Sequence, residues 1–245
     1  MSDFFLFVAV GFLAQLVDGA IGMAYGLIST SILLGHGIPA VTASASVHAA
    51  EIFTTFMSGL SHWKLGNIDF KLIKRLVPAG MVGGATGAYI LTSVPNDTIK
   101  LMVSFYLLVM GIVIVAKALK KLAQPPYNPK FVPLIGLMGG FLDAIGGGGW
   151  GPLVTSNLLG QGTTPRIAIG STSLAEFFVT FTISMTFVFS IGLDLWVIIL
   201  GLIVGGVLAA PIAAIAAKRM PPRILMGLVG ALIIFLSART LILAL

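Results

Sequence analysis

The chain has 245 residues, of which 58% are hydrophobic and only 9% are charged, with a mean hydropathy of +1.08. Soluble domains carry about 25% charged residues, so this composition excludes a water-soluble protein and indicates an integral membrane protein that contacts the lipid bilayer. The absence of cysteine excludes disulfides and thiolate sites, and the net charge of +6 fits the positive-inside bias of membrane proteins, with no patch typical of nucleic-acid binding.

An internal repeat spans most of the chain, because residues 11 to about 116 recur without a gap 125 positions later. Asp18 matches Asp143, Glu51 matches Glu176, and 15 of 38 positions are identical between residues 18–55 and their counterparts. This predicts a first membrane repeat over residues 1–120, a basic cytoplasmic linker over 121–130 and a second repeat over 131–245.

Each copy begins with a segment that is too short for two full crossings. Residues 4–35 and 131–160 each span about 45 Å as helix, whereas two crossings of a 30 Å core need about 40 residues. We therefore predict re-entrant hairpins of two short helices. The apolar start lacks a basic region, so it is interpreted as a membrane segment and not as a signal peptide.

Three full crossings are predicted after each hairpin, so the fold class is an all-α integral membrane protein. The predicted crossings are residues 40–60, 76–93 and 99–117 in the first copy, and 166–189, 195–217 and 224–244 in the second.

The distribution of Lys and Arg predicts the orientation of the two copies. Basic residues gather in loops 61–75, 117–130 and 218–223, whereas the counterparts of the first and last of these loops, 189–200 and 93–98, have none. The bias reverses between copies, which predicts inverted topology with both termini on the outer side. Inverted repeats of this kind are typical of alternating-access transporters.

The tips of the hairpins, residues 18–26 and 143–151, are rich in glycine. A helix that begins near Gly26 or Gly151 would direct free N–H groups and a positive dipole end toward the midplane, which predicts an anion site without a basic side chain. Tip residues predicted to bind substrate are Gly22, Tyr25, Gly26, Gly147, Gly148, Gly149 and Trp150. Whether Tyr25 and Trp150 line the cavity or anchor the membrane interface is left open, and Asp18 and Asp143 are expected to cap the tips.

Close helix packing is the alternative explanation for glycine in these spans. It is favoured for the isolated pairs Gly83, Gly84, Gly205 and Gly206. Pro39 and Pro165 are expected to open the first full helix of each copy, with Thr164 as a cap.

Glu51 and Glu176 follow these prolines by 12 and 11 residues, which places them near mid-membrane. Buried carboxylates at that depth are functional candidates. Two roles stay open: accepting N–H bonds from the glycine tip of the other copy, or binding a proton.

His48 precedes Glu51 by one helical turn, and its counterpart is Ser173. The chain has no second such pair, so neither a metal site nor a cofactor is predicted. His48 is interpreted as a core residue or as a residue of the anion path. Ser46, Ser171, Thr172 and Ser173 can donate hydroxyl hydrogen bonds, although Ser173 and Glu176 also fit a capping box. Asn157 has no polar counterpart and could make the site asymmetric.

The chain resembles the TauE/SafE family of sulfite exporters. The duplicated unit, the run Gly146-Gly147-Gly148-Gly149-Trp150-Gly151-Pro152, and residues 168–173 followed by Glu176 carry the resemblance. It implies a prokaryotic plasma-membrane transporter for sulfur-containing anions such as sulfite or sulfoacetate, with export as the implied direction. The first tip departs from the glycine run, with Met23 and Ala24 opposite Gly148 and Gly149.

The function predicted is therefore a secondary transporter of a small anion, with a midplane site between the tips and no enzymatic activity. The alternatives are an anion channel, a proton- or cation-coupled permease for another organic anion, a cation transporter using Glu51 and Glu176, and a membrane-embedded enzyme using His48. The chain has no nucleotide-binding P-loop, so ATP hydrolysis is not expected. Whether two copies form a homodimer is left open.

Overall fold

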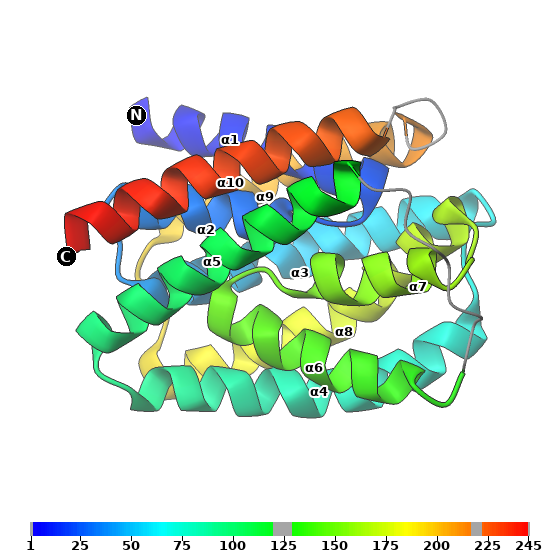
Figure 1. The fold of residues 1–245 in the computed structure, drawn as a ribbon, viewed down its shortest axis with the longest axis horizontal. Coiled ribbons are helices and arrows are strands. Elements are labelled where there is room, and N and C mark those ends of the chain that lie inside the picture. Colours follow the sequence, from blue (N-terminus) through cyan, green and yellow to red (C-terminus); the bar gives the residue numbers. More distant parts are fainter. Residues whose placement is uncertain (1, 120–128, 217–221, 245) are drawn as a thin grey trace.

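The computed structural model describes residues 2–119, 129–216 and 222–244, and these residues are helical apart from short connections (Figure 1). The elements are α1 (Ser2–Ile21), α2 (Tyr25–Gly35), α3 (Ala40–Lys64), α4 (Phe70–Ser93), α5 (Asn96–Leu119), α6 (Val132–Gly146), the π-helix η1 (Gly151–Thr155), α7 (Ser156–Gly160), α8 (Pro165–Ile191), α9 (Trp196–Ala216) and α10 (Pro222–Ala244).

Five of the described helices, α1, α5, α8, α9 and α10, are long and apolar enough to cross a membrane. This makes the chain a multi-pass membrane protein. Helices α3 and α4 have similar lengths, 25 and 24 residues, but carry more polar groups. Helix α3 contains His48 and Glu51, and α4 begins with basic residues. All six predicted full crossings coincide with helices, within a few residues at each end.

The prediction of two short helices over residues 4–35 is wrong for the first of them. Helix α1 has 20 residues, enough to span about 30 Å, whereas α2 has 11 and α6 has 15. The predicted tip begins at residue 18, but Gly19 is still helical in α1. It packs against Ala213 of α9. The non-helical breaks are therefore only residues 22–24 and 147–149. These two breaks are 125 residues apart, as in the sequence repeat.

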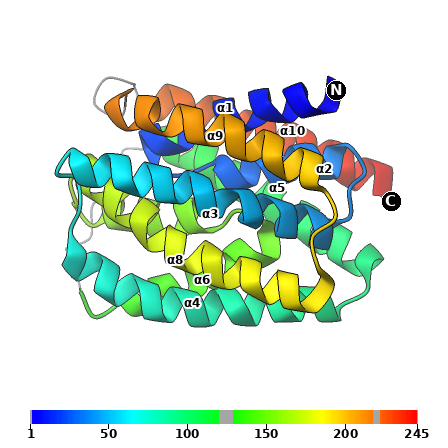
Figure 2. The same cartoon turned by 180° about the vertical axis from the view of Figure 1, so that it is seen from behind.

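Helix packing follows the same spacing. Helix α1 packs on α9 as α6 packs on α4, α3 packs on α9 as α8 packs on α4, and α3 pairs with α8 and α5 with α10 (Figures 1 and 2). Small residues allow these approaches, because a Cβ on Gly205 would collide with the Val8 carbonyl, and one on Gly83 with the Leu137 carbonyl. A Cβ on Gly84 would likewise collide with the Ile183 side chain, and one on Gly206 with the Thr54 side chain. The packing role predicted for these four glycines is confirmed.

The two termini lie at the same end of the molecule (Figure 1). The α3–α4 connection and the starts of α6 and α10 lie at the opposite end (Figures 1 and 2). There the Arg75 guanidinium donates to the Pro129 carbonyl at 3.4 Å. Most of the predicted basic linker, residues 121–128, lies outside the described residues, as do Lys218 and Arg219.

The starts of α3 and α8 lie where the prolines predict them. Pro39 immediately precedes α3, and Pro165 is the first residue of α8. Thr164 holds the capping position, but its side chain makes no capping hydrogen bond. The predicted capping box of Ser173 and Glu176 is wrong, because both residues lie well inside α8.

Candidate functional site

The two helix breaks meet at the centre of the molecule and interlock. A Cβ on Gly26 would collide with the Gly147 carbonyl and lie 2.7 Å from the Cα of Gly148. The Thr30 hydroxyl donates to the Gly147 carbonyl at 2.8 Å. Gly22 and Gly147 adopt positive φ, 71° and 64°, a conformation that glycine tolerates best. In this structure each tip therefore fills the space that the sequence analysis assigned to a ligand between them.

Aspartate side chains accept hydrogen bonds from backbone N–H groups at the end of each break. Asp143 Oδ1 accepts from the N–H groups of Gly149 at 2.7 Å and Trp150 at 3.0 Å, and Asp18 Oδ1 accepts from that of Tyr25 at 3.4 Å. This is the capping arrangement expected for the two aspartates. The prediction that these N–H groups are free for an anion is therefore wrong for this conformation, because a carboxylate already accepts their hydrogen bonds.

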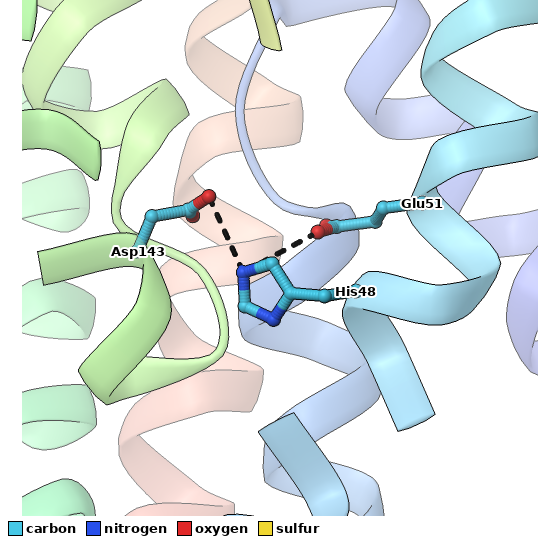
Figure 3. Close-up of side chains that lie close together, drawn as sticks. All are labelled: His48, Glu51 and Asp143. Carbon is cyan, nitrogen blue, oxygen red and sulfur yellow. Dashed lines mark hydrogen bonds and ion pairs between the residues drawn. The ribbon is translucent and has the colours of Figure 1, made fainter. Parts of the chain in front are cut away.

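His48 brings the two copies together at this point (Figure 3). Its Nε2 lies 3.4 Å from Asp143 Oδ2 and 3.8 Å from Glu51 Oε2. All three side chains are buried. His48 and Glu51 come from α3, whereas Asp143 comes from α6, 95 residues away from His48 in the sequence. We call these three residues the buried triad.

The corresponding positions of the other copy are Ser173, Glu176 and Asp18, all buried. They lack an imidazole, so the centre is asymmetric. Within the described chain, neither glutamate carboxylate accepts a hydrogen bond from a tip N–H group. The proposed tie between the glutamates and the tips is therefore not made by Glu51 or Glu176, because the aspartates take those N–H groups.

Tyr25 and Trp150 are buried, so neither is an interface anchor in this structure. The Tyr25 hydroxyl donates to the Leu202 carbonyl of α9 at 3.1 Å. The Trp150 indole donates to the Thr172 carbonyl of α8 at 3.2 Å, and its ring packs against Gly80 and Gly139. Both aromatic residues thus fix the start of a hairpin's second helix against a long helix.

The predicted hydroxyl donors are separated by the fold. Ser46 lines a cavity of about 330 Å³ between the ends of α3, α4 and α8, which also contains Thr42, Thr92 and Asp194. Ser171, the counterpart of Ser46, accepts from the Asp69 N–H at 2.8 Å, and Gly170 beside it abuts the Asn67 carbonyl. The surface around Ser46 in the first copy is thus open to a cavity, whereas the equivalent surface around Ser171 in the second copy is in contact with the α3–α4 connection.

A second cavity, of about 520 Å³, lies at the basic end of the molecule. It is lined by Met23 of the first break, by Thr163 and Thr164, and by Arg223. The second cavity touches the first break through Met23, whereas no residue of either break lines the first cavity.

A model of the sulfite exporter TauE/SafE family matches residues 7–240 of the chain. The chain belongs to the TauE/SafE family. A relative from Bacillus subtilis (strain 168), the probable membrane transporter protein YtnM, is 41% identical over an alignment of 252 residues, gaps included. The alignment covers 99% of this chain and 84% of the relative. No solved structure matches the chain.

The residues that carry the TauE/SafE likeness lie together at the centre of the fold. The Thr155 hydroxyl donates to that of Thr172 at 2.9 Å, so the segment after the glycine run is tied to α8. Asn157 instead donates to the Leu153 carbonyl of its own segment at 2.6 Å. The asymmetry that the sequence assigned to Asn157 is found at His48.

Lys117 of this TauE/SafE protein makes a contact that the sequence does not predict. The distribution of basic residues places it in the loop 117–130, but it lies in α5. Its Nζ donates to the Pro152 carbonyl at 3.1 Å and to the Ser156 hydroxyl at 2.5 Å. A π-helix leaves irregular carbonyls, and Lys117 satisfies one of them. The only sequence signal for this contact is that Lys117 falls within the last turn of the predicted crossing 99–117.

Proposed function

We propose that this chain is a secondary transporter of small sulfur-containing anions, such as sulfite or C2 organosulfonates like sulfoacetate. Membership of the TauE/SafE family supports this substrate class. The single observation that carries the mechanism is the pair of cavities at opposite ends of a molecule whose two breaks interlock. Cavities at both ends with tightly packed breaks between the copies fit a carrier better than an open pore.

The mechanism we propose is alternating access by an inverted repeat, each copy with three full helices and one re-entrant hairpin. The reversed charge bias of the copies and the matching helix pairs support this arrangement. Because Ser46 faces a cavity while Ser171 bonds to Asp69, exchanging the conformations of the copies would bring the surfaces around Ser46 into contact and part those around Ser171.

The substrate binds, in this proposal, when the two breaks part and the N–H groups of Gly149 and Trp150 become available. A cavity of about 330 Å³ lies in the range of about 300–1,000 Å³ that small-molecule sites occupy. We place both termini outside the plasma membrane of a prokaryotic cell, with export as the direction of net transport.

Purified protein in proteoliposomes tests this function. Vesicles loaded with unlabelled sulfoacetate should accumulate labelled sulfoacetate by exchange, with saturation, whereas empty vesicles should not. Sulfite should compete and sodium or potassium salts of a non-sulfur anion should not. Linear, non-saturating flux without exchange would indicate an anion channel, and exchange of a metal cation alone would overturn the substrate class.

Single cysteines test the asymmetry of the two ends, since the natural chain contains none. In the conformation described here, Ser46→Cys is expected to react with a thiol reagent faster than Ser171→Cys, because Ser46, although 1% exposed, lines a cavity, whereas Ser171 is packed against Asp69. Mass spectrometry of the labelled protein measures both rates. Substrate that drives the cycle should narrow the difference, and equal rates from the start would contradict the assigned conformation.

A further inference from the structure

The hydrogen-bond partners of His48 determine where its ring carries a proton. Its Nδ1 lies 2.8 Å from the Ser44 carbonyl, which can only accept. The Ser44 hydroxyl, 3.3 Å from Nδ1, already donates to the Ala144 carbonyl at 2.7 Å, so it also faces Nδ1 as an acceptor. Nδ1 therefore carries a hydrogen, and in a neutral ring Nε2 has only a lone pair.

That lone pair would face two carboxylates. Asp143 Oδ2 lies 3.4 Å and Glu51 Oε2 3.8 Å from Nε2, and Glu51 Oε2 has no hydrogen-bond partner although it is buried. Three acceptors around one point without a donor are unstable in a buried site. The buried triad thus lacks a hydrogen between these acceptors, and with it one positive charge.

The surroundings do not supply that charge. The other titratable groups that act electrostatically on the triad are Asp18 of α1, Glu176 of α8, Tyr25 of α2 and Tyr106 of α5. Both tyrosine hydroxyls point to carbonyls, those of Leu202 and Gly148. In the described chain no Lys or Arg side chain bonds to the triad, so the missing charge has to come from solution.

We propose that His48, Glu51 and Asp143 bind one proton, shared between Nε2 and a carboxylate, and that this proton is bound together with the substrate anion. The inference rests on the proposed transport function and identifies its coupling ion. A proton fits the observed separations, because a protonated Nε2 needs only small shortening to bond to Asp143. A metal ion would need all three ligand atoms, now up to 4.8 Å apart, to converge, and alkali or Mg²⁺ ions disfavour imidazole.

The triad is placed so that its proton affects both hairpins. Asp143 holds the N–H groups of Gly149 and Trp150 with its other oxygen, so a proton on this carboxylate weakens its hold on them. Glu51 Oε1 lies 2.9 Å from where a Cβ of Gly26 would be, against the other tip. Neutralising the triad thus frees tip N–H groups and removes repulsion of an incoming anion.

Reciprocal linkage gives the expected effect: the anion takes up a proton, and lower pH raises anion affinity, by up to about tenfold per pH unit for one coupled proton. Sulfoacetate is the probe for this experiment, because its sulfonate stays ionised and sulfite itself titrates near neutrality. The measurements are proton uptake by the weakly buffered purified protein on adding sulfoacetate, and the pH dependence of its affinity.

Glu51→Gln is the main variant, because it keeps the shape and removes no hydrogen bond, and His48→Gln is the second. Both should lose proton uptake and flatten the pH dependence. His36→Gln is the matched control, since His36 is exposed and its Nδ1 also bonds a carbonyl four residues earlier, at 2.8 Å. The control should behave as the natural protein.

Infrared titration without any anion separates this proposal from the transport function. A pH-dependent carboxyl or imidazolium signal that Glu51→Gln or His48→Gln removes supports the proton site even if no sulfur anion is transported. Absence of such a signal, or unchanged proton uptake per anion in Glu51→Gln, overturns the proposal while transport can stand. One bound transition-metal ion per chain that His48→Gln releases would overturn it in favour of a metal site.

Discussion

Asp143→Ala is expected to be the most damaging substitution at the centre of this protein and to abolish transport. The carboxylate serves three groups at once: the N–H groups of Gly149 and Trp150 through Oδ1, and His48 through Oδ2. Alanine would take the acceptor away from the two buried N–H groups and leave Glu51 as the remaining carboxylate beside His48. Removing one member of a buried charged pair costs about 3–5 kcal/mol, so the thermal midpoint of the detergent-purified protein should fall steeply.

Asp18→Ala is the natural comparison, because Asp18 occupies the same position in the first copy. Its hydrogen bond from the Tyr25 N–H is long, at 3.4 Å, and it has no histidine partner among the described residues. Its loss should therefore lower the thermal midpoint much less than Asp143→Ala does. Equal shifts in the two variants would show that the asymmetry of the hydrogen bonds has no energetic consequence.

Gly26→Ala is expected to prevent the two breaks from interlocking. A Cβ at this position would overlap the Gly147 carbonyl and lie 2.7 Å from the Gly148 Cα and 2.9 Å from Glu51 Oε1. Two of these neighbours are backbone atoms of the other copy, which cannot rotate away. Overpacking of this kind costs about 1–3 kcal/mol. Exchange of labelled sulfoacetate should fall at least tenfold along with the thermal midpoint.

Gly35→Ala in the same helix gives the control for Gly26→Ala. Gly35 also lies in α2, but the nearest atoms to its added Cβ are Arg239 Nη1 at 3.7 Å and Leu236 Cδ2 at 4.0 Å, which is ordinary contact. Because alanine favours helix over glycine by about 1 kcal/mol, this variant should be as stable as the natural protein or slightly more so. A loss in Gly35→Ala as large as in Gly26→Ala would mean that helix geometry, and not contact between the breaks, explains the effect.

Two differences between the copies bear directly on the centre of the molecule. The breaks share their spacing and positive φ at Gly22 and Gly147, and each is followed by a buried aromatic residue. The copies differ where His48 replaces the serine of the second copy, and where a π-helix, bonded by Lys117, stands in place of the start of α2. The similarity of the two halves allows two alternating-access conformations of similar architecture. Because only one half contributes a histidine to the centre, the protein can still bind a single proton at the buried triad.

Sequence alone determined the membrane class, six of the long helices, the two breaks 125 residues apart and the mid-helix positions of Glu51 and Glu176. These features depend on composition, on the length of apolar runs and on glycine and proline, which act locally along the chain. Mid-helix positions follow from a fixed rise per residue, so Glu51 and Glu176 could be placed without knowledge of any neighbour.

Only the tertiary structure decided that the tips interlock, that α1 continues past Gly19, and that His48 of one copy meets Asp143 of the other. Each of these depends on how closely two helices approach, as where Gly19 packs on Ala213 and Gly26 on the Gly147 carbonyl. Hydropathy sets which segments enter the membrane, but lipid is as apolar as the helices, so packing between small residues selects their partners. That selection brings together groups 95 residues apart, and no local pattern in the sequence records it.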